Sequence, residues 1–319
     1  MALRSIMAGA LALALGSIGA AQAQQARVMI PAGAGGGWDG TGRGAMNAMQ
    51  QAGIFTDGVQ YTNKGGAAGT IGLAEFASTQ KGQDNAIMIM GAIMVGGIAL
   101  NKSPVTLDQV TPIARLTNEY NTIAVPANSP LKSVADFVAA LKANPGAVAI
   151  AGGSAGGVDH IAVALIAKAI GVEVSKINYV PTQSGAEVVA GVVGGKYAAG
   201  VSGISELKPQ ADTGRMRLIA VTSEKRVADL PNVPTLMESG VAVAIGNWRG
   251  VVGAPGMSAA GLKTWTDRFD RMAKSAPWQE TLKKQGWDDA YLSGPAFASF
   301  LKAENERMTA ALKDVGLLK

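Results

Sequence analysis

Cysteine is absent from this 319-residue sequence, and histidine occurs only once, as His160. Without cysteine the chain can form no disulfide, no thiolate metal site and no lipid-linked cysteine, so its hydrophobic core must hold the fold. One histidine among scattered carboxylates has no metal-ligand spacing and leaves general-base chemistry poorly supplied. The sequence therefore predicts no metal and no organic cofactor, and it favours binding over catalysis.

Charged residues are also few: they make up 16% of the sequence, against 48% hydrophobic residues, and the formal net charge is +5. This small positive excess forms no basic stripe, so nucleic acid is not expected as a partner. The hydrophobic content is enough for a sizeable core, and the chain is long enough to divide into two domains.

The segment 1–23 has the three parts of a secretory signal peptide. Arg4 supplies the positive n-region, an apolar run covers residues 8–20, and Ala21-Gln22-Ala23 matches an A-x-A cleavage site. A membrane anchor is the alternative, but the run is shorter than the roughly 20 residues that span a bilayer. We therefore expect cleavage after Ala23 and a free protein in the periplasm.

Glycine is abundant, with 42 residues, and three of its clusters follow strand-like runs and precede helix-like ones. A loop without side chains that leads into a helix exposes free backbone N–H groups at the positive end of the helix dipole. Three such loops indicate a small ligand with several negative charges. The candidate ligand-binding residues in these loops are Gly35, Gly36, Gly37, Trp38 and Asp39, then Gly66, Ala67, Gly69 and Thr70, and then Gly153, Ser154, Ala155 and Gly157.

Two nucleotide motifs are weaker interpretations of these loops. None carries the Lys-Ser/Thr tail of a Walker A loop. The first has the G-x-G-x-x-G spacing of a dinucleotide site over residues 35–40, but the bulky Trp38 stands within it and an exported protein meets little NAD. Asp39 is either a ligand contact or a carboxylate that caps the following helix.

The third loop fits the G-x-S-x-G pattern of a serine hydrolase, with Ser154 as nucleophile. A secreted hydrolase is therefore the alternative from another functional class. The test is the base, and the single histidine lies only six residues after Ser154 on the expected helix, too far round it to face the serine at hydrogen-bond distance. His160 is better interpreted as a residue of the cleft or of the helix start.

Strand-like and helix-like runs alternate along the chain, which predicts an α/β fold with mainly parallel sheets. The expected strands cover residues 27–31, 59–63, 86–90, 122–125, 147–151, 176–180, 197–202, 217–222 and 247–252. The expected helices cover 41–51, 69–79, 133–143, 158–170, 185–193, 258–274, 278–285 and 295–312. In the last of these, Phe297, Phe300, Leu301, Met308 and Leu312 lie along one side, which indicates packing on the core.

Several of these segments resemble one known family. They include Pro31-Ala32-Gly33-Ala34-Gly35-Gly36-Gly37-Trp38-Asp39, Asn63-Lys64-Gly65-Gly66, Val125-Pro126-Ala127-Asn128-Ser129-Pro130, Asp159-His160, Leu230-Pro231-Asn232-Val233-Pro234-Thr235 and Asn247-Trp248-Arg249-Gly250. They resemble the tricarboxylate-binding branch of the Bug family, the periplasmic solute receptors of tripartite tricarboxylate transporters. The resemblance spans nearly the whole mature chain.

The resemblance implies a type II periplasmic-binding-protein fold, in which two α/β domains joined by two crossover strands clamp the ligand between them. Residues 24–124 and 246–319 would form a discontinuous domain 1, and residues 125–245 domain 2. The resemblance further implies a monomer that is not an enzyme and delivers a di- or tricarboxylate to the membrane subunits of the transporter. A sensor subunit that presents its ligand to a signalling receptor is a further alternative.

The ligand class follows, by the same resemblance, from one departure. Relatives that take amino acids often place an aspartate after the strand at 198–201, where this chain has Ser202, so no partner for an ammonium group is expected. A citrate-like ligand is therefore favoured over an amino acid, and an aromatic dicarboxylate is the alternative. Polar contacts are expected from Thr182, Gln183 and Ser184. Arg249 and Arg43 would either contact the ligand or form structural ion pairs.

Overall fold

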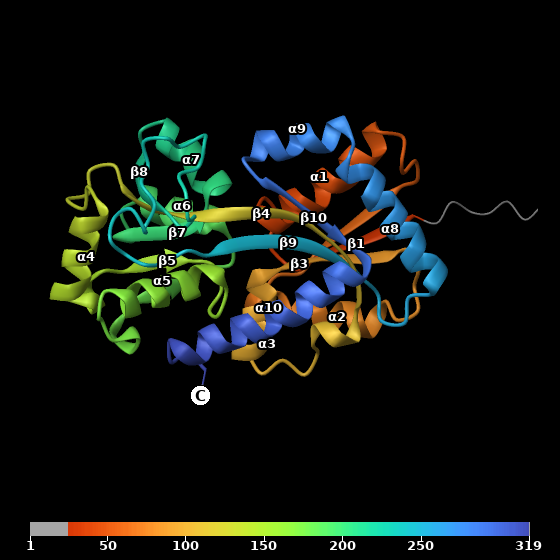
Figure 1. The fold of residues 1–319 in the computed structure, drawn as a ribbon, viewed down its shortest axis with the longest axis horizontal. Helices are drawn as coiled ribbons and strands as arrows, with labels where there is room; N and C mark the ends of the chain where they lie inside the picture. Colours follow the sequence, from red (N-terminus) through yellow and green to blue (C-terminus); the bar gives the residue numbers. More distant parts are fainter. Residues whose placement is uncertain (1–24, 319) are drawn as a thin grey trace, which may run out of the picture.

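The computed structural model describes residues 25–318. The predicted signal peptide lies outside the described residues. No helix within 25–318 is both long and apolar enough to cross a bilayer. Figure 1 shows two lobes, each with a sheet covered by helices, and the long strands β4 and β9 running between them.

The sheet of the first lobe is built from the two ends of the chain. Its strand order is β2-β1-β3-β9-β4, with β10 paired to the other edge of β4. The strands are β1 (Ala26–Ile30), β2 (Val59–Asn63), β3 (Ala86–Gly91), β4 (Thr111–Pro126), β9 (Gly246–Gly253) and β10 (Asp288–Ser293). The helices are α1 (Gly37–Gln51), α2 (Thr70–Thr79), α3 (Ala92–Leu100), α8 (Ala259–Ala273), α9 (Ala276–Gln285) and α10 (Gly294–Asp314).

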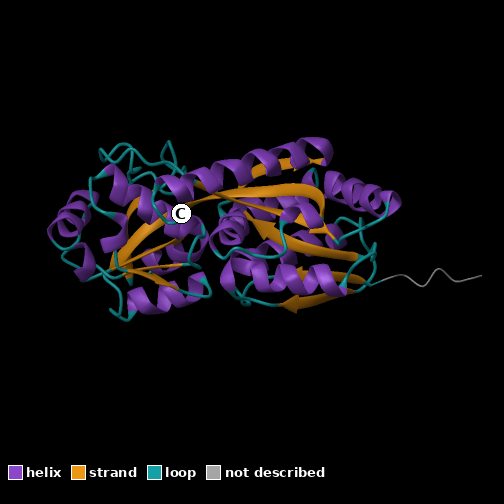
Figure 2. Ribbon diagram, turned by 90° about the horizontal axis from the view of Figure 1, so that it is seen from below, coloured by secondary structure: helices purple, strands orange, loops and turns teal. Residues whose placement is uncertain are grey.

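The second lobe is formed by the middle of the chain. Its strands are the end of β4, β5 (Ile150–Gly152), β6 (Tyr179–Pro181), β7 (Ala199–Gly203) and β8 (Met216–Val221). Its helices are α4 (Val134–Ala143), α5 (Val158–Ala169), α6 (Gly185–Val193) and α7 (Ile204–Asp212). Figure 2 shows helices on both sides of the strands in each lobe.

Strand β4 changes partners part-way along its length. From Thr111 to Tyr120 it pairs with β9, and from Asn121 onward it pairs with β7 and β8. The predicted domain boundaries at 124/125 and 245/246 lie close to this change and to the start of β9, and we keep them as a proposal. The shared strands fix how the two lobes face each other.

The predicted helices and strands recur with shifted ends. Helix α1 begins at Gly37 instead of residue 41, and the strand expected at 176–180 is preceded by a 3-10 turn, Val174–Lys176, so that β6 begins at Tyr179. Helices α3 and α7 and strand β10 were not predicted. The expected packing side of α10 is confirmed: Phe297, Leu301, Met308 and Leu312 are buried, and Phe300 packs against them from a partly buried position.

Candidate functional site

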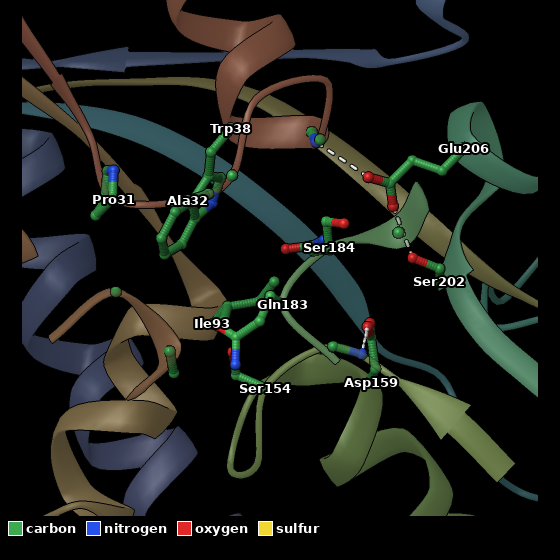
Figure 3. A pocket seen from close by; sticks show the side chains of 18 of the residues that line it. Pro31, Ala32, Trp38, Ile93, Ser154, Asp159, Gln183, Ser184, Ser202 and Glu206 are labelled. Carbon is green, nitrogen blue, oxygen red and sulfur yellow. Dashed lines mark hydrogen bonds between the residues drawn. The ribbon is translucent and has the colours of Figure 1, made fainter. Parts of the chain in front are cut away.

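A cavity lies between the two lobes and encloses about 640 Å³ of space, including its mouth. The first lobe contributes the loop after β1, the loop before α2, the start of α3 and two side chains of β9. The second lobe contributes the loops before α5 and α6, the first turn of α5, the C-terminal end of β7 and the first turn of α7. Figure 3 shows side chains from both lobes converging on this space.

Many of the residues predicted from the sequence do line this cavity: Gly36, Gly37, Trp38, Gly66, Gly69, Gly153, Ser154, Gln183, Ser184, Ser202 and Arg249. The other predicted residues lie in the same loops or just behind them and are not part of the lining: Gly35, Asp39, Ala67, Thr70, Ala155, Gly157, His160 and Thr182. The three glycine loops are therefore brought together. Their contact with a ligand remains a prediction.

Glycine N-caps are common among the helices that begin around the cavity, although α6, whose Ser184 and Gly185 also line it, has a serine N-cap whose hydroxyl accepts the N–H of Glu187. Helices α1, α2, α3, α5 and α7 all start after a glycine, and none of these N-caps forms a side-chain hydrogen bond to its helix. Helices α4 and α8, which contribute no lining residue, instead have serine N-caps, Ser133 and Ser258, whose hydroxyls accept a backbone N–H bond. Helix starts without a side-chain cap can leave N–H groups for an anion, but in α1 and α7 the N–H groups of Gly37 and Ser205 are already accepted by Glu206 and Glu119.

Asp39 organises the first loop from behind. Its carboxylate accepts hydrogen bonds from the backbone N–H of Gly35 (3.0 Å), from Asn63 (3.0 Å) and from Arg43 (2.9 Å). Burial acts to raise the pKa of Asp39, but these hydrogen bonds together hold it below the ordinary value. Asp39 does not cap α1, whose N-cap is Gly36; it holds the loop before the helix through Gly35, and Arg43 is its ion-pair partner.

Arg249 both lines the cavity and forms an ion pair. One of its terminal nitrogens, Nη2, pairs with the carboxylate of Glu119, and the two side chains are 2% and 0% exposed. The guanidinium also lies 4.9 Å from the ring centre of Trp287. Its Nη1 is buried and has no hydrogen-bond partner among residues 25–318, so one donor of the guanidinium is left unsatisfied.

Two further polar atoms of lining residues are buried with no hydrogen-bond partner in the described part of the chain: the indole Nε1 of Trp38 and the amide Oδ1 of Asn247. Buried polar atoms are usually hydrogen-bonded, and those left over at a cavity are candidates for ligand contacts. Asn247 was not among the predicted site residues.

The cavity also contains two acidic side chains that the sequence analysis did not assign to it. Glu206 lies in the first turn of α7, and Asp159 in the first turn of α5. Burial raises the pKa of both: that of Asp159 to about 7, and that of Glu206 above its ordinary value, with the negative charge of Glu119 acting in the same direction. The expectation that no acid stands near Ser202 is wrong, because Glu206 accepts a 2.6 Å hydrogen bond from its hydroxyl.

His160 is not arranged as a base for Ser154. Its Nδ1 accepts a hydrogen bond from the backbone N–H of Gly156 (3.1 Å), so in the neutral ring Nε2 carries the proton and cannot accept one from a serine. Burial lowers the pKa of His160 to about 4, and the ring stacks on Tyr179 with centroids 4.2 Å apart. This geometry supports a structural role in ordering the third loop.

A family model described as the tripartite tricarboxylate transporter family receptor, TctC, matches residues 45–317. The chain belongs to this family. The resemblance to the Bug family of receptors is thereby confirmed, and the match includes the second and third glycine loops, the two acids and Arg249.

Two relatives of this TctC-family chain are 28% and 23% identical to it over the aligned residues. A UPF0065 protein in the gbd 5' region of Cupriavidus necator is 28% identical over 199 residues, which are 62% of this chain and 59% of that relative. The match thus spans less than two thirds of that relative's length. Protein BugT of Bordetella pertussis is 23% identical over 298 residues, which are 92% of this chain and 90% of the relative.

Solved structures confirm the fold of this TctC-family member as that of a two-domain periplasmic binding protein. The periplasmic binding protein BugD has a TM-score of 0.84 at 23% identity, covering 92% of this chain and 98% of BugD. The structure of R. palustris Rpa4515 with adipate has a TM-score of 0.82 at 21% identity, covering 92% of this chain and 97% of Rpa4515. The structure of MatC from Rhodopseudomonas palustris with bound malate has a TM-score of 0.78 at 18% identity, covering 90% of this chain and 98% of MatC.

Proposed function

We propose that this protein is a periplasmic solute receptor that captures a small carboxylate between its lobes and delivers it to the membrane subunits of a tripartite tricarboxylate transporter. One observation carries the proposal: five helices from both lobes that start after a glycine begin around one cavity, beside a second loop whose N–H groups no carboxylate of residues 25–318 accepts and the buried guanidinium of Arg249. Such N–H groups and dipoles bind carboxylates without any covalent chemistry.

The acidic lining of the cavity and the ligands of proteins with this fold limit the class of ligand that we propose. The ligands named for two proteins of this fold, malate and adipate, are dicarboxylates. Asp159 and Glu206 make each additional negative charge on the ligand costly, because like charges repel strongly in a poorly hydrated site. Within the predicted range of di- and tricarboxylates, we therefore place a dicarboxylate ahead of citrate.

Calorimetry on the mature protein tests this function. Titration with succinate, malate, aspartate, adipate and citrate should give micromolar or tighter binding for at least one of them. At 100 times Kd that ligand should stabilise the fold by about 2.7 kcal/mol. The bound ligand should be recovered unchanged after long incubation, and Ser154→Ala should not alter its recovery. No heat with any of these acids would refute the proposed function, and turnover abolished by Ser154→Ala would favour the hydrolase.

Intact-mass measurement of the protein from a periplasmic extract tests the remaining features. A mass that begins at Gln24 would support cleavage after Ala23, and light scattering should give the mass of a monomer. Retention of the protein in the cytoplasm would contradict the transport role.

A further inference from the structure

Charge around the cavity is unbalanced. Glu119, Asp159, Glu206 and Arg249 form or directly back its lining, which gives three carboxylates and one guanidinium. The guanidinium is already paired with Glu119, so its charge is largely compensated before any ligand enters. Asp159 and Glu206 form no ion pair within the described part of the chain, although the charge of Arg249 acts to lower the pKa of Glu206. A purely anionic ligand would add negative charge to this region.

Glu206 occupies the anion position of the first loop. Its Oε1 accepts the backbone N–H of Gly37 across the cavity at 3.0 Å, while its Oε2 accepts the hydroxyl of Ser202 at 2.6 Å (Figure 3). Gly185 packs against it so closely that a Cβ there would lie 2.3 Å from the carboxylate carbon. The side chain is therefore fixed in place, and the first N–H of α1 is already satisfied by the protein.

Asp159 occupies the third loop in the same way. One oxygen accepts the backbone N–H of Gly153 at 2.7 Å (Figure 3), and the other accepts the side-chain amide of Asn121 at 2.5 Å. Thus two of the three loops already hold a carboxylate of the protein. A ligand group that approaches these acids must donate hydrogen bonds and is stabilised further if it is positively charged.

The second loop differs from the other two. No carboxylate of residues 25–318 accepts an N–H of this loop, 65–70, and its backbone is held in unusual conformations: Ala67 and Ala68 have φ of 47° and 57°. Left-handed backbone costs energy for a residue with a Cβ, and consecutive turns of this kind point N–H groups into a concave anion site. This loop, with the free donor of Arg249, remains available for a carboxylate.

We propose that Asp159 and Glu206 form a cation subsite, and that the ligand is an amino carboxylate whose carboxylate binds at the second loop while its ammonium group binds between the two acids. This inference rests on the proposed function, because it specifies the class of carboxylate that the receptor takes. It replaces the sequence-based expectation of an all-carboxylate ligand.

Matched ligand pairs test the subsite. L-Aspartate and L-malate differ only in an ammonium group against a hydroxyl, and so do 4-aminobutyrate and 4-hydroxybutyrate. In calorimetry at pH 8, we expect the amino member of at least one pair to bind tenfold to a hundredfold tighter, the range of one charged hydrogen bond. Equal or tighter binding of the hydroxy member in both pairs would overturn the inference while leaving the proposed function in place. No binding of any member would count against both.

Charge-removing variants assign the effect to the acids. Glu206→Gln keeps an oxygen for the N–H of Gly37 but should lose at least tenfold in affinity for the amino ligand, with little change for its hydroxy partner. Asp159→Asn should act in the same direction, and the exposed Glu173→Gln serves as the control. Thermal melting of each free variant reports folding. An amino preference that survives in both folded variants would overturn the subsite. If neither variant folds, the wild-type affinity for the amino ligand should fall from pH 8 to pH 5.5, and an unchanged affinity would overturn it.

Discussion

Gly96 of α3 lies against the carbonyl oxygen of Gly156 so closely that a Cβ atom on Gly96 would come within 2.1 Å of that oxygen. Helix α3 belongs to the first lobe, whereas Gly156 stands in the loop before α5 in the second lobe. The contact therefore joins the two sides of the cavity, and it exists only because residue 96 has no side chain.

Gly96→Ala should hold the lobes apart. Alanine favours the helix that surrounds it, so the first lobe should fold normally, but the added methyl group obstructs the approach of Gly156. We expect ligand affinity to fall at least tenfold, and X-ray scattering at saturating ligand should give a larger radius of gyration than for the wild type. Gly146→Ala, where a Cβ meets no atom closer than 3.8 Å, is the control. Wild-type affinity and compaction in Gly96→Ala would show that this contact does not limit closure.

Alanine substitutions at two neighbouring glycines of the first loop should have very different effects on ligand binding and stability. A Cβ on Gly37 would lie 2.4 Å from the Arg249 guanidinium, whereas one on Gly36 meets nothing closer than 3.7 Å. Because Gly37→Ala displaces the buried ion pair, it should weaken binding by tenfold or more and lower the melting temperature, while Gly36→Ala should change both little. Calorimetry and thermal melting of the two variants decide this, and equal losses in both would contradict the geometry.

Removing one partner of the buried pair of Arg249 and Glu119 should destabilise the fold strongly. Replacing both partners with apolar residues should destabilise it less than the sum of the two single changes. Removing one partner of such a pair leaves an uncompensated charge and typically destabilises by 3–5 kcal/mol. Arg249→Met and Glu119→Leu should therefore each lower the free energy of unfolding by about that amount in urea titrations, and the double variant should lose less than the sum of the two. Additive losses would mean that the two side chains do not interact energetically.

Stability should depend on pH through two groups that act in opposite directions. Burial raises the pKa of Asp159 from 3.8 to about 7, so the folded state holds a proton that the unfolded state loses, and stability falls as pH rises from about 4 to 7. Burial lowers the pKa of His160 from 6.5 to about 4, so its contribution to stability rises with pH between about 4 and 6.5. The two effects largely cancel in the wild type.

Asp159→Asn should unmask the rising contribution of His160. Its melting temperature relative to wild type should increase by several degrees from pH 5 to pH 7.5, since about 1 kcal/mol corresponds to roughly 2–4 °C. His160→Gln should show the opposite trend. Parallel melting curves of Asp159→Asn and wild type across this range would mean that Asp159 titrates alike in the folded and unfolded states.

The parts of the site that sequence predicted are those with a local signal. Glycine clusters between a strand and a helix identify backbone anion sites without knowledge of the fold, and all three clusters contribute to the cavity. The position of Asp39 near a helix start also suggested a structural role, although its carboxylate holds the loop at Gly35 and does not cap the helix. These features depend only on neighbours within a few residues.

Glu206 and Glu119 depend on tertiary partners and were missed. Helix α7 contains Pro209 and begins directly after β7 with no loop, so neither its periodicity nor its start is visible in the sequence. Glu119 lies in the polar middle of β4, between Asn118 and Tyr120, which is typical of a turn. It is buried only because Arg249 lies on the paired strand, a neighbour that is distant in sequence. The signal that could have revealed Glu119 is a polar run flanked by apolar strand residues.

The position of β9 has a consequence for the order in which the chain folds. This strand lies between β3 and β4, and its pairing of Gly253 with Ile87 closes a very long loop. Contacts between residues so far apart are slow to form, because the chain loses conformational entropy on closing the loop before these contacts stabilise it. The second lobe draws its strands from a continuous stretch and can assemble early, whereas the sheet of the first lobe stays divided until residues 246–253 arrive. We therefore expect the lobe that carries Asp159 and Glu206 to become structured first, with the first lobe completed around it.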